Sequence, residues 1–185
     1  MKYGTGYAAQ LEAAKDIVIN SIAETMDLYG INRSTGNLYG TMLFEDSMTL
    51  DEMRSELQMS KPSMSAGVKK LQEFAVVKQR FTRGSRKQHF EAEKDFFAFF
   101  SNFFTQKWYR EIKINMAALQ EAEAMIDTII AADDVEDDVR QEAQEVKAHM
   151  THSRLYYQWL NSISDAIKSG EIFKYFPIPD ENKDA

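Results

Sequence analysis

Residues 49–92 read TLDEMRSELQMSKPSMSAGVKKLQEFAVVKQRFTRGSRKQHFEA. Thr49, followed three residues later by Glu52, is a capping box that predicts the start of a short helix. Ser60 is a suitable cap for a second helix, which tolerates Pro62 in its first turn. Apolar residues then recur on one face of this helix, at Met64, Val68, Leu71 and Ala75. Two short helices joined by a tight connection predict a helix-turn-helix.

A basic hairpin is expected directly after this pair of helices. Residues 76–81 are rich in strand formers, and residues 87–92 form the second strand candidate. The polar segment between them, residues 82–86, has Gly84 at its centre. A basic β-hairpin in this position is called a wing.

The rest of the chain is predicted to be helical. A first helix runs from about Ala8 to Tyr29, and Ser34 caps a short second helix that ends near Glu45. Beyond Asp95 the pattern is helical, with breaks at the acidic residues 132–138 and at Gly170, before a Pro177/Pro179 tail. The expected fold class is mainly α with a small β-hairpin wing. Residues 1–95 would form a winged helix-turn-helix domain, and residues 96–185 a helical dimerisation and effector-binding module.

Composition narrows the class of protein. The chain has no cysteine, which excludes disulfides, thiolate metal sites and thiol nucleophiles. Residues 1–10 lack the features of a signal peptide, and no run of eighteen apolar residues is present. We therefore expect a cytoplasmic protein that is not associated with a membrane.

The charges are unevenly distributed. The formal net charge is −7, yet residues 54–90 hold nine Lys and Arg against only Glu56 and Glu73. Phosphate contacts supply much of the affinity of proteins for DNA, and an acidic remainder limits indiscriminate binding. This pattern favours a single docking face for double-stranded DNA.

The element order and several motifs resemble the MarR superfamily of bacterial regulators, and within it the GbsR-type repressors. The resemblance rests on residues 48–53, 57–65 and 68–71, and on the wing leading into residues 90–97. It covers most of the chain, although the C-terminal half carries weaker motifs. The resemblance implies a homodimeric DNA-binding repressor of genes for osmoprotectant uptake or synthesis. It also implies a small-molecule effector of the quaternary ammonium class, such as choline or glycine betaine.

Short polar and cationic side chains occupy the helix face opposite Met64, and they suit an approach to the major groove. The alternative is an ordinary solvated basic face. At the wing, arginine side chains are long enough to enter a minor groove, or they merely solubilise a hairpin tip. The predicted DNA-binding residues are Ser60, Lys61, Ser63, Ser65, Lys69, Lys70, Arg83, Arg86 and Lys87.

Aromatic side chains crowd the helix that begins near Phe96, on two of its faces. Most of these rings are expected to form core and dimer interface. The effector class implied by the resemblance suggests that a few of them form a cage, because ring faces attract methylated cations. The candidate ligand-binding residues are Trp108, Tyr109, Tyr156 and Trp159, chosen for ring type and position.

No constellation of catalytic residues is present, so we expect neither an enzyme nor a cofactor. Glu145, His149 and His152 fall on one helix face at a spacing that suits a divalent metal, but a solvated polar face is the expected reading. No metal site is therefore predicted. Two alternatives stay open: a metal-responsive winged-helix regulator that uses these three residues, and a winged-helix scaffold that binds proteins instead of DNA.

Overall fold

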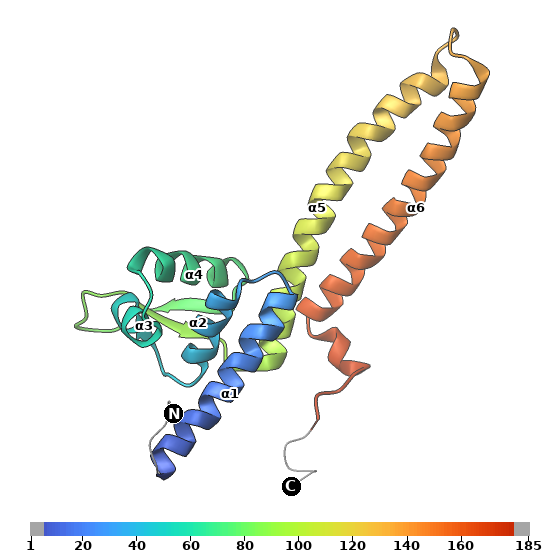
Figure 1. Cartoon of the computed structure of the whole chain (residues 1–185). Helices are drawn as coiled ribbons and strands as arrows, with labels where there is room; N and C mark the ends of the chain where they lie inside the picture. Colours follow the sequence, from blue (N-terminus) through green and yellow to red (C-terminus); the bar gives the residue numbers. More distant parts are fainter. Residues whose placement is uncertain (1–5, 180–185) are drawn as a thin grey trace. The chain divides into compact units, whose positions relative to one another are not determined.

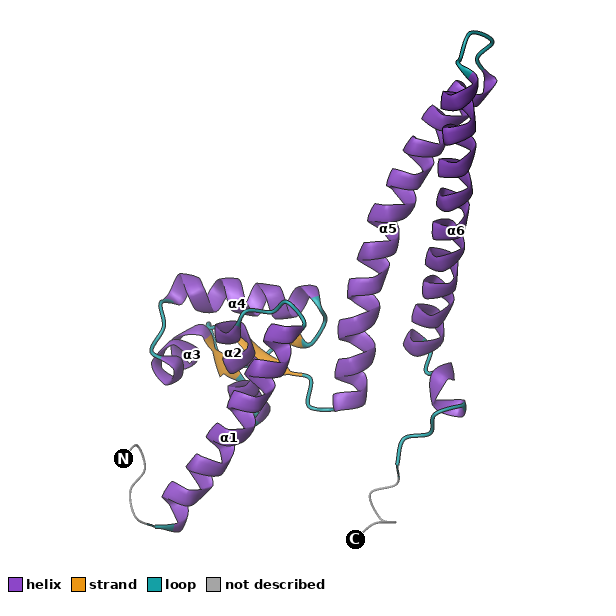
Figure 2. Ribbon diagram, turned by 45° about the vertical axis from the view of Figure 1, so that its right-hand side comes forward, coloured by secondary structure: helices purple, strands orange, loops and turns teal. Residues whose placement is uncertain are grey.

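The computed structural model describes residues 6–179. The chain divides into two compact units, Met1–Phe103 and Phe104–Ala185. The first unit contains four helices, a small sheet and the start of a fifth helix, and the second contains a long helical hairpin (Figure 1). The mainly helical fold with a small sheet agrees with the expected class. Figure 2 shows how little of the chain is in strands.

The first unit begins with two helices that cross closely. Helix α1 spans Tyr7–Leu28 and α2 spans Arg33–Leu43. The end of α1 agrees with the predicted end near Tyr29, and Gly30 follows at φ 80°. A Cβ atom added at Gly36 of α2 would lie only 2.7 Å from the Cα of Ala23 in α1. The absence of a side chain at Gly36 therefore allows the two helix backbones to approach.

The cap of α2 differs from the prediction. Asn32, not Ser34, is the N-cap, and its side-chain oxygen accepts a hydrogen bond of 2.9 Å from the backbone N–H of Thr35. Ser34 lies inside the first turn and donates its hydroxyl to Asn32 Oδ1 at 2.8 Å. Both residue types cap helices well, so the sequence pattern alone did not separate them.

The helix-turn-helix forms as predicted. Helix α3 spans Leu50–Leu57 and begins with a complete capping box between Thr49 and Glu52. Helix α4 spans Lys61–Glu73 and is capped by Ser60, whose hydroxyl accepts from the backbone N–H of Ser63.

Helix α4 ends in a Schellman motif. The backbone N–H of Ala75 donates to the carbonyl of Gln72 at 2.9 Å, and that of Val76 donates to the carbonyl of Leu71 at 3.1 Å. Ala75 adopts a left-handed conformation at φ 54°. This motif turns the chain from α4 into the wing.

The sheet has three antiparallel strands in the order β1-β3-β2. The wing strands β2, Val77–Arg80, and β3, His89–Ala92, pair with Gln79 opposite Phe90. Strand β1, Met48–Thr49, was not predicted, and it pairs with the other edge of β3. It is only two residues long, which is too short to show the alternation that identifies a strand.

The core of the first unit joins the helix-turn-helix to the sheet and to the start of α5. Phe103 is fully buried, and its ring lies 4.6 Å from that of Phe74 and 5.4 Å from that of Phe99. The predicted face of α4 is buried, but Ala75 is exposed because it lies beyond the helix end. Other buried side chains here are Leu38, Met42, Met53, Met64, Val68, Leu71, Val76 and Phe90.

The second unit is a hairpin of two long antiparallel helices (Figures 1 and 2). Helix α5 spans Phe96–Ala131, starting in the first unit, and α6 spans Asp137–Lys168. The guanidinium of Arg140 donates to the carbonyls of Ile130 and Ala132 and so closes the connection between the helices. None of the helices within residues 6–179 is long and apolar enough to cross a membrane.

Ion pairs and a terminal turn complete the hairpin. Arg154 pairs with Glu123, and Lys147 Nζ lies 2.5 Å from Asp127 Oδ1. The chain leaves α6 through Gly170, at φ 78°, which agrees with the predicted break, and it continues into a 3-10 turn at Glu171–Lys174.

Candidate nucleic-acid interface

The predicted DNA-binding residues of α4 lie on the face of the helix away from the core. Met64 and Val68 point into the unit with 2% of their surface exposed, whereas Lys70 is half-buried. The other five predicted residues on this helix and its cap are all exposed: Ser60, Lys61, Ser63, Ser65 and Lys69. The amphipathic spacing of the sequence thus separates a core face from a polar, cationic face.

Several side chains of this face have local partners. Lys70 Nζ lies 3.1 Å from Glu73 Oε2 and 5.1 Å from the centre of the Phe74 ring. The hydroxyls of Ser60 and Ser63 are hydrogen-bonded at 2.8 Å. These contacts are exposed, so each contributes little to stability and exchanges readily for another partner.

The wing presents the remaining predicted residues. Gly84, at φ 83°, allows the turn between the strands, and Arg83 and Arg86 are exposed on either side of it. The hydroxyl of Ser85 accepts from the backbone N–H of Lys87 at 3.1 Å and lies 3.1 Å from His89 Nε2. The base of the wing loop is therefore ordered by hydrogen bonds, while the arginine side chains stay in solvent.

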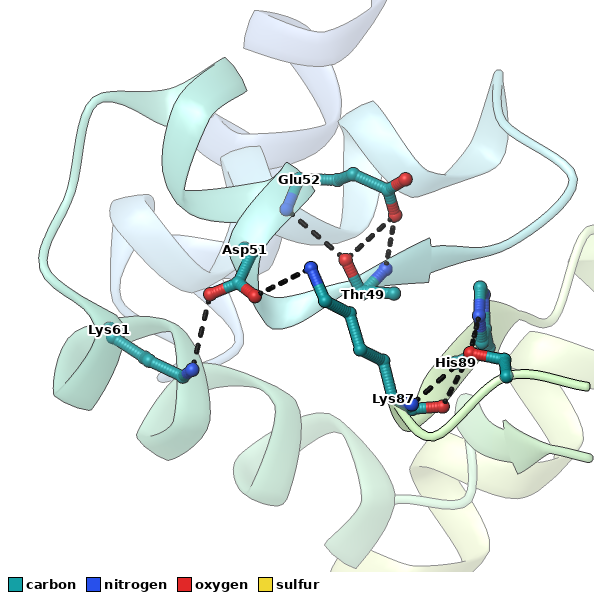
Figure 3. A network of polar contacts seen from close by, with 7 residues as sticks. Thr49, Asp51, Glu52, Lys61, Lys87 and His89 are labelled. Atoms are coloured by element: carbon teal, nitrogen blue, oxygen red, sulfur yellow. Dashed lines mark hydrogen bonds and ion pairs between the residues drawn. The ribbon is translucent and has the colours of Figure 1, made fainter.

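A network of polar contacts joins the wing to both helices of the helix-turn-helix (Figure 3). Asp51 Oδ1 lies 3.1 Å from Lys61 Nζ of α4, and Asp51 Oδ2 lies 3.0 Å from Lys87 Nζ of the wing. The hydrogen bonds from Lys87 and Lys61 lower the pKa of Asp51, and those from Thr49 lower the pKa of Glu52. Both carboxylates are therefore ionised near neutral pH.

The geometry of this surface suits a polyanion. The N-terminal end of α4 carries a partial positive charge, and Lys61 adds a full one. Cations from α4 and from the wing surround a shallow cleft of about 430 Å³. Its lining residues are Thr49, Leu50, Asp51, Lys61, Arg86, Lys87 and Gln88.

The four candidate rings for an effector all lie in the second unit and form two separate groups. Trp108 and Tyr109 are on α5, where Trp108 packs 5.7 Å from the ring of Phe104. Tyr156 and Trp159 are on α6, with ring centres 6.0 Å apart, and they are 45% and 57% exposed.

The contacts of Tyr109 show which residues of α6 lie beside it. Its hydroxyl donates to Asp165 Oδ1 at 2.6 Å, and Lys168 Nζ lies 5.3 Å from its ring centre. Burial and the bond to Asp165 raise the pKa of Tyr109 to about 12. Asp165 lies six residues beyond Trp159 on α6, or roughly 9 Å at the helical rise. Within one chain, the structure therefore does not gather the four rings into one cage.

The first unit contains an aromatic pocket that no sequence pattern predicted. The cavity, of about 230 Å³, lies between α1, α2 and the first turns of α5. Phe96 and Phe99 belong to the aromatic-rich helix, and no sequence pattern pairs them with α1 or α2. The lining residues are Ser21, Ile22, Thr25, Met26, Tyr29, Tyr39, Phe96 and Phe99.

One residue links this pocket to the wing. The ring of Tyr39 packs 5.0 Å from that of Phe99, and its hydroxyl donates to the backbone carbonyl of Glu93 at 2.6 Å. Glu93 lies between strand β3 and helix α5. Burial raises the pKa of Tyr39, so the hydroxyl keeps its proton and stays a donor.

The alternative metal site finds no support in the geometry. Glu145, His149 and His152 are all exposed on α6. Across residues 6–179, no three His, Asp or Glu side chains are placed to hold a metal ion together.

Comparison with known proteins gives the family. The family described as "GbsR family transcriptional regulator, C-terminal helical hairpin" matches residues 96–174. The HTH-type transcriptional repressor GbsR of Bacillus subtilis (strain 168) is 55% identical over 170 residues, covering 92% of this chain and 94% of the relative. The HTH-type transcriptional repressor OpcR of the same organism is 24% identical, covering 90% and 91%.

A solved structure, described as a transcriptional regulator, shares the fold with a TM-score of 0.51 at 16% identity, covering 85% of this chain and 98% of that one. These similar proteins are transcriptional regulators, and the expected absence of catalytic function agrees with them. The exposed cationic face of a helix-turn-helix and its wing agrees with the same function. The chain is a DNA-binding transcriptional regulator and belongs to the GbsR family.

Proposed function

We propose that the chain is a homodimeric repressor whose α4 enters the major groove of its operator while the wing contacts the adjacent backbone or minor groove. A quaternary ammonium effector of the choline or glycine betaine class lowers its affinity for DNA. In the cytoplasm it controls genes for osmoprotectant uptake or synthesis. The observation that carries the DNA-binding part is the shared exposure of cations from α4 and the wing around one cleft.

Lys69 and Lys70 provide the test of the DNA face. Replacing both with Ala weakens binding to every duplex, because ammonium groups that neutralise phosphates carry no sequence preference. The slope of log affinity against log salt concentration becomes shallower by about 0.9 for each lost phosphate contact. Fluorescence anisotropy with a labelled duplex, at salt concentrations of about 50 to 200 mM, measures both quantities.

Arg110 and Lys113 are a matched control, because both are exposed on α5 in the second unit. Their double replacement by Ala removes the same charge but leaves the α4 face intact. If the Lys69/Lys70 variant binds DNA as tightly as the parent at the same salt, α4 is not the DNA face.

Exposed apolar side chains support the homodimer. On α1, Leu11 and Ile17 are 59% and 71% exposed, and on α6, Leu155 and Trp159 are 59% and 57% exposed. Long helices with apolar residues in solvent favour burial against a second copy. Light scattering should give twice the chain mass of 21.3 kDa. A stable species of the single-chain mass at micromolar concentration contradicts the dimer.

For the effector, we propose the aromatic pocket of the first unit as the binding site. Tyr29 and Phe96, which are 38% and 57% exposed, offer aromatic surface to a methylated cation, whereas Tyr39 is part of the buried wall. The apolar walls remove water that would weaken the attraction. Occupation of the pocket pushes on Tyr39, whose hydroxyl holds the link between β3 and α5 at Glu93. The effector then acts by favouring a wing position that DNA does not accept, since only differential affinity shifts a conformational equilibrium.

Calorimetry with choline tests this site. Choline should bind more tightly than 3,3-dimethylbutanol, which has the same shape without the charge. Tyr29→Leu should weaken choline binding, because it keeps apolar volume but removes one ring face, whereas Tyr175→Leu is a control on an exposed ring of the second unit. Equal affinity for both compounds refutes a site driven by cation–π attraction.

The competing location is the set of rings proposed from the sequence. Loss of choline binding in Trp108→Ala or Trp159→Ala, with Tyr29→Leu unaffected, assigns the effector to Trp108, Tyr109, Tyr156 and Trp159. Given the separation of these rings within one chain, that result would require rings from both subunits of the dimer.

A further inference from the structure

One carboxylate holds two of the proposed DNA-binding lysines. Lys61 begins α4 and Lys87 ends the wing loop, and each places its ammonium on a different oxygen of Asp51 (Figure 3). Asp51 is itself in the first turn of α3. A single side chain therefore ties together the three segments that surround the cleft.

The contacts are suited to exchange. The side chains of Asp51, Lys61 and Lys87 are 43%, 58% and 63% exposed, so water and salt screen both pairs. A carboxylate offers an ammonium group the same kind of partner as a DNA phosphate does, an anionic oxygen that accepts its hydrogen bonds. Asp51 is ionised near neutral pH, because the two lysines hold its pKa below the usual range.

We propose that Asp51 is an internal competitor that occupies Lys61 and Lys87 in the free protein and that DNA phosphates must displace. This rests on the proposed docking of α4 and the wing on DNA. The carboxylate stays next to the interface after displacement, where it repels the phosphates. Asp51 thus lowers affinity for all duplex DNA, operator or not, and reduces the number of effective cations in the interface by one in each subunit.

Removing the charge of Asp51 is expected to strengthen DNA binding. Asp51→Asn keeps the size of the side chain and removes its charge. Exposed ion pairs contribute about 0.2 to 1 kcal/mol each, so releasing two of them raises affinity roughly two- to thirtyfold. The slope of log affinity against log salt concentration becomes steeper by about 0.9 per subunit, because one further phosphate charge is neutralised. Operator and unrelated duplex gain by the same factor.

The test measures anisotropy with a fluorescein-labelled duplex of unrelated sequence, over a salt series. Asp46→Asn is the matched control: Asp46 is an exposed partner of Arg80 in the same unit, at 2.8 Å, and its replacement gives the same change in net charge. Asp51→Asn should exceed this control in both affinity and slope. Weaker binding of Asp51→Asn overturns the proposal, because it would mean that the carboxylate positions the lysines for DNA.

A variant that lacks both lysines distinguishes competition by Asp51 from a general effect of net charge. In a Lys61→Gln, Lys87→Gln variant, Asp51→Asn should change affinity no more than Asp46→Asn does, because the lysines through which it acts are gone. If Asp51→Asn raises DNA affinity in this variant as much as it does in the parent, the proposal is wrong. If the two Gln substitutions weaken DNA binding but Asp51→Asn does not strengthen it, the proposal for Asp51 is wrong and the proposed DNA face stands. If neither the Gln substitutions nor the Lys69/Lys70 variant changes binding, the proposed DNA face fails.

Discussion

Replacing Tyr39 with Phe removes one hydroxyl group and leaves the packed ring in place. Tyr39 is 1% exposed, and its hydroxyl donates to the carbonyl of Glu93 at 2.6 Å. A typical internal hydrogen bond contributes about 0.5 to 1.5 kcal/mol, and a buried acceptor left without a donor costs about 1 to 3 kcal/mol. Glu93 is only half-buried, so water can partly replace the lost hydrogen bond to its carbonyl. We expect a decrease of about 1 to 2 kcal/mol in the free energy of unfolding.

Urea denaturation followed by circular dichroism measures this decrease. With a slope of about 3 kcal/mol per molar urea, the midpoint should fall by roughly 0.5 M. Tyr7→Phe is the control, because Tyr7 is 90% exposed and loses the same hydroxyl without a buried bond. Its midpoint should match that of the parent.

The pH dependence gives a second check. Burial raises the pKa of Tyr39 above its ordinary value of 10.0 in the folded state, so the stabilising bond is fully present below pH 10. Above pH 10 this tyrosine ionises in the unfolded chain, which stabilises the unfolded state. The free energy of unfolding of the parent therefore falls as pH rises, whereas that of the Phe variant does not change through this group. The two proteins should therefore become more alike as pH rises above 10. If they unfold at the same urea concentration at neutral pH, the bond between α2 and the β3–α5 link contributes nothing to stability.

The remaining predictions concern the helices that support the DNA face. Gly36→Val should lower the melting temperature by forcing α1 and α2 apart at Ala23, at a cost of about 1 to 3 kcal/mol or more. Unchanged melting would mean that the crossing has more room than the structure indicates. Thr49→Ala should cost about 1 kcal/mol in thermal unfolding, because it removes the acceptor for the backbone N–H of Glu52 at 3.3 Å. Glu52→Gln should cost less, since an amide oxygen still reaches the Thr49 backbone.

The sequence was informative where a single segment carries both a cap and a buried face. Thr49 with Glu52, and Ser60 before Met64, each combine a side-chain acceptor with the apolar spacing of one helix face. Local chemistry then determines the element almost alone, and the structure confirms both helices. At α2 the prediction that Ser34 is the cap was wrong, because Asn32, two residues earlier, has a similar capping propensity and is the N-cap in the structure.

The aromatic pocket of the first unit could not be predicted from the sequence, because it depends on contacts between distant segments. Tyr29 follows α1, Tyr39 lies in α2 and Phe99 lies in α5, and no local pattern shows which rings meet. The same reason applies to Asp51, whose two lysine partners lie ten and thirty-six residues away along the chain. Charge counting located the basic segment, but only the fold shows that Asp51, which precedes this segment in the sequence, pairs with two of its lysines.

The backbone at Ala75 has an evolutionary consequence. The Schellman motif that ends α4 places this residue at φ 54°, where a side chain costs about 1 to 2 kcal/mol relative to the right-handed region. Alanine and glycine codons differ by a single nucleotide, so a residue free of that strain is one mutation away. Ala75 is exposed and outside the α4 face, so such a change would alter neither the core nor the side chains proposed to contact DNA. Alanine at this position fits a protein selected to exceed a stability threshold, not to maximise its stability.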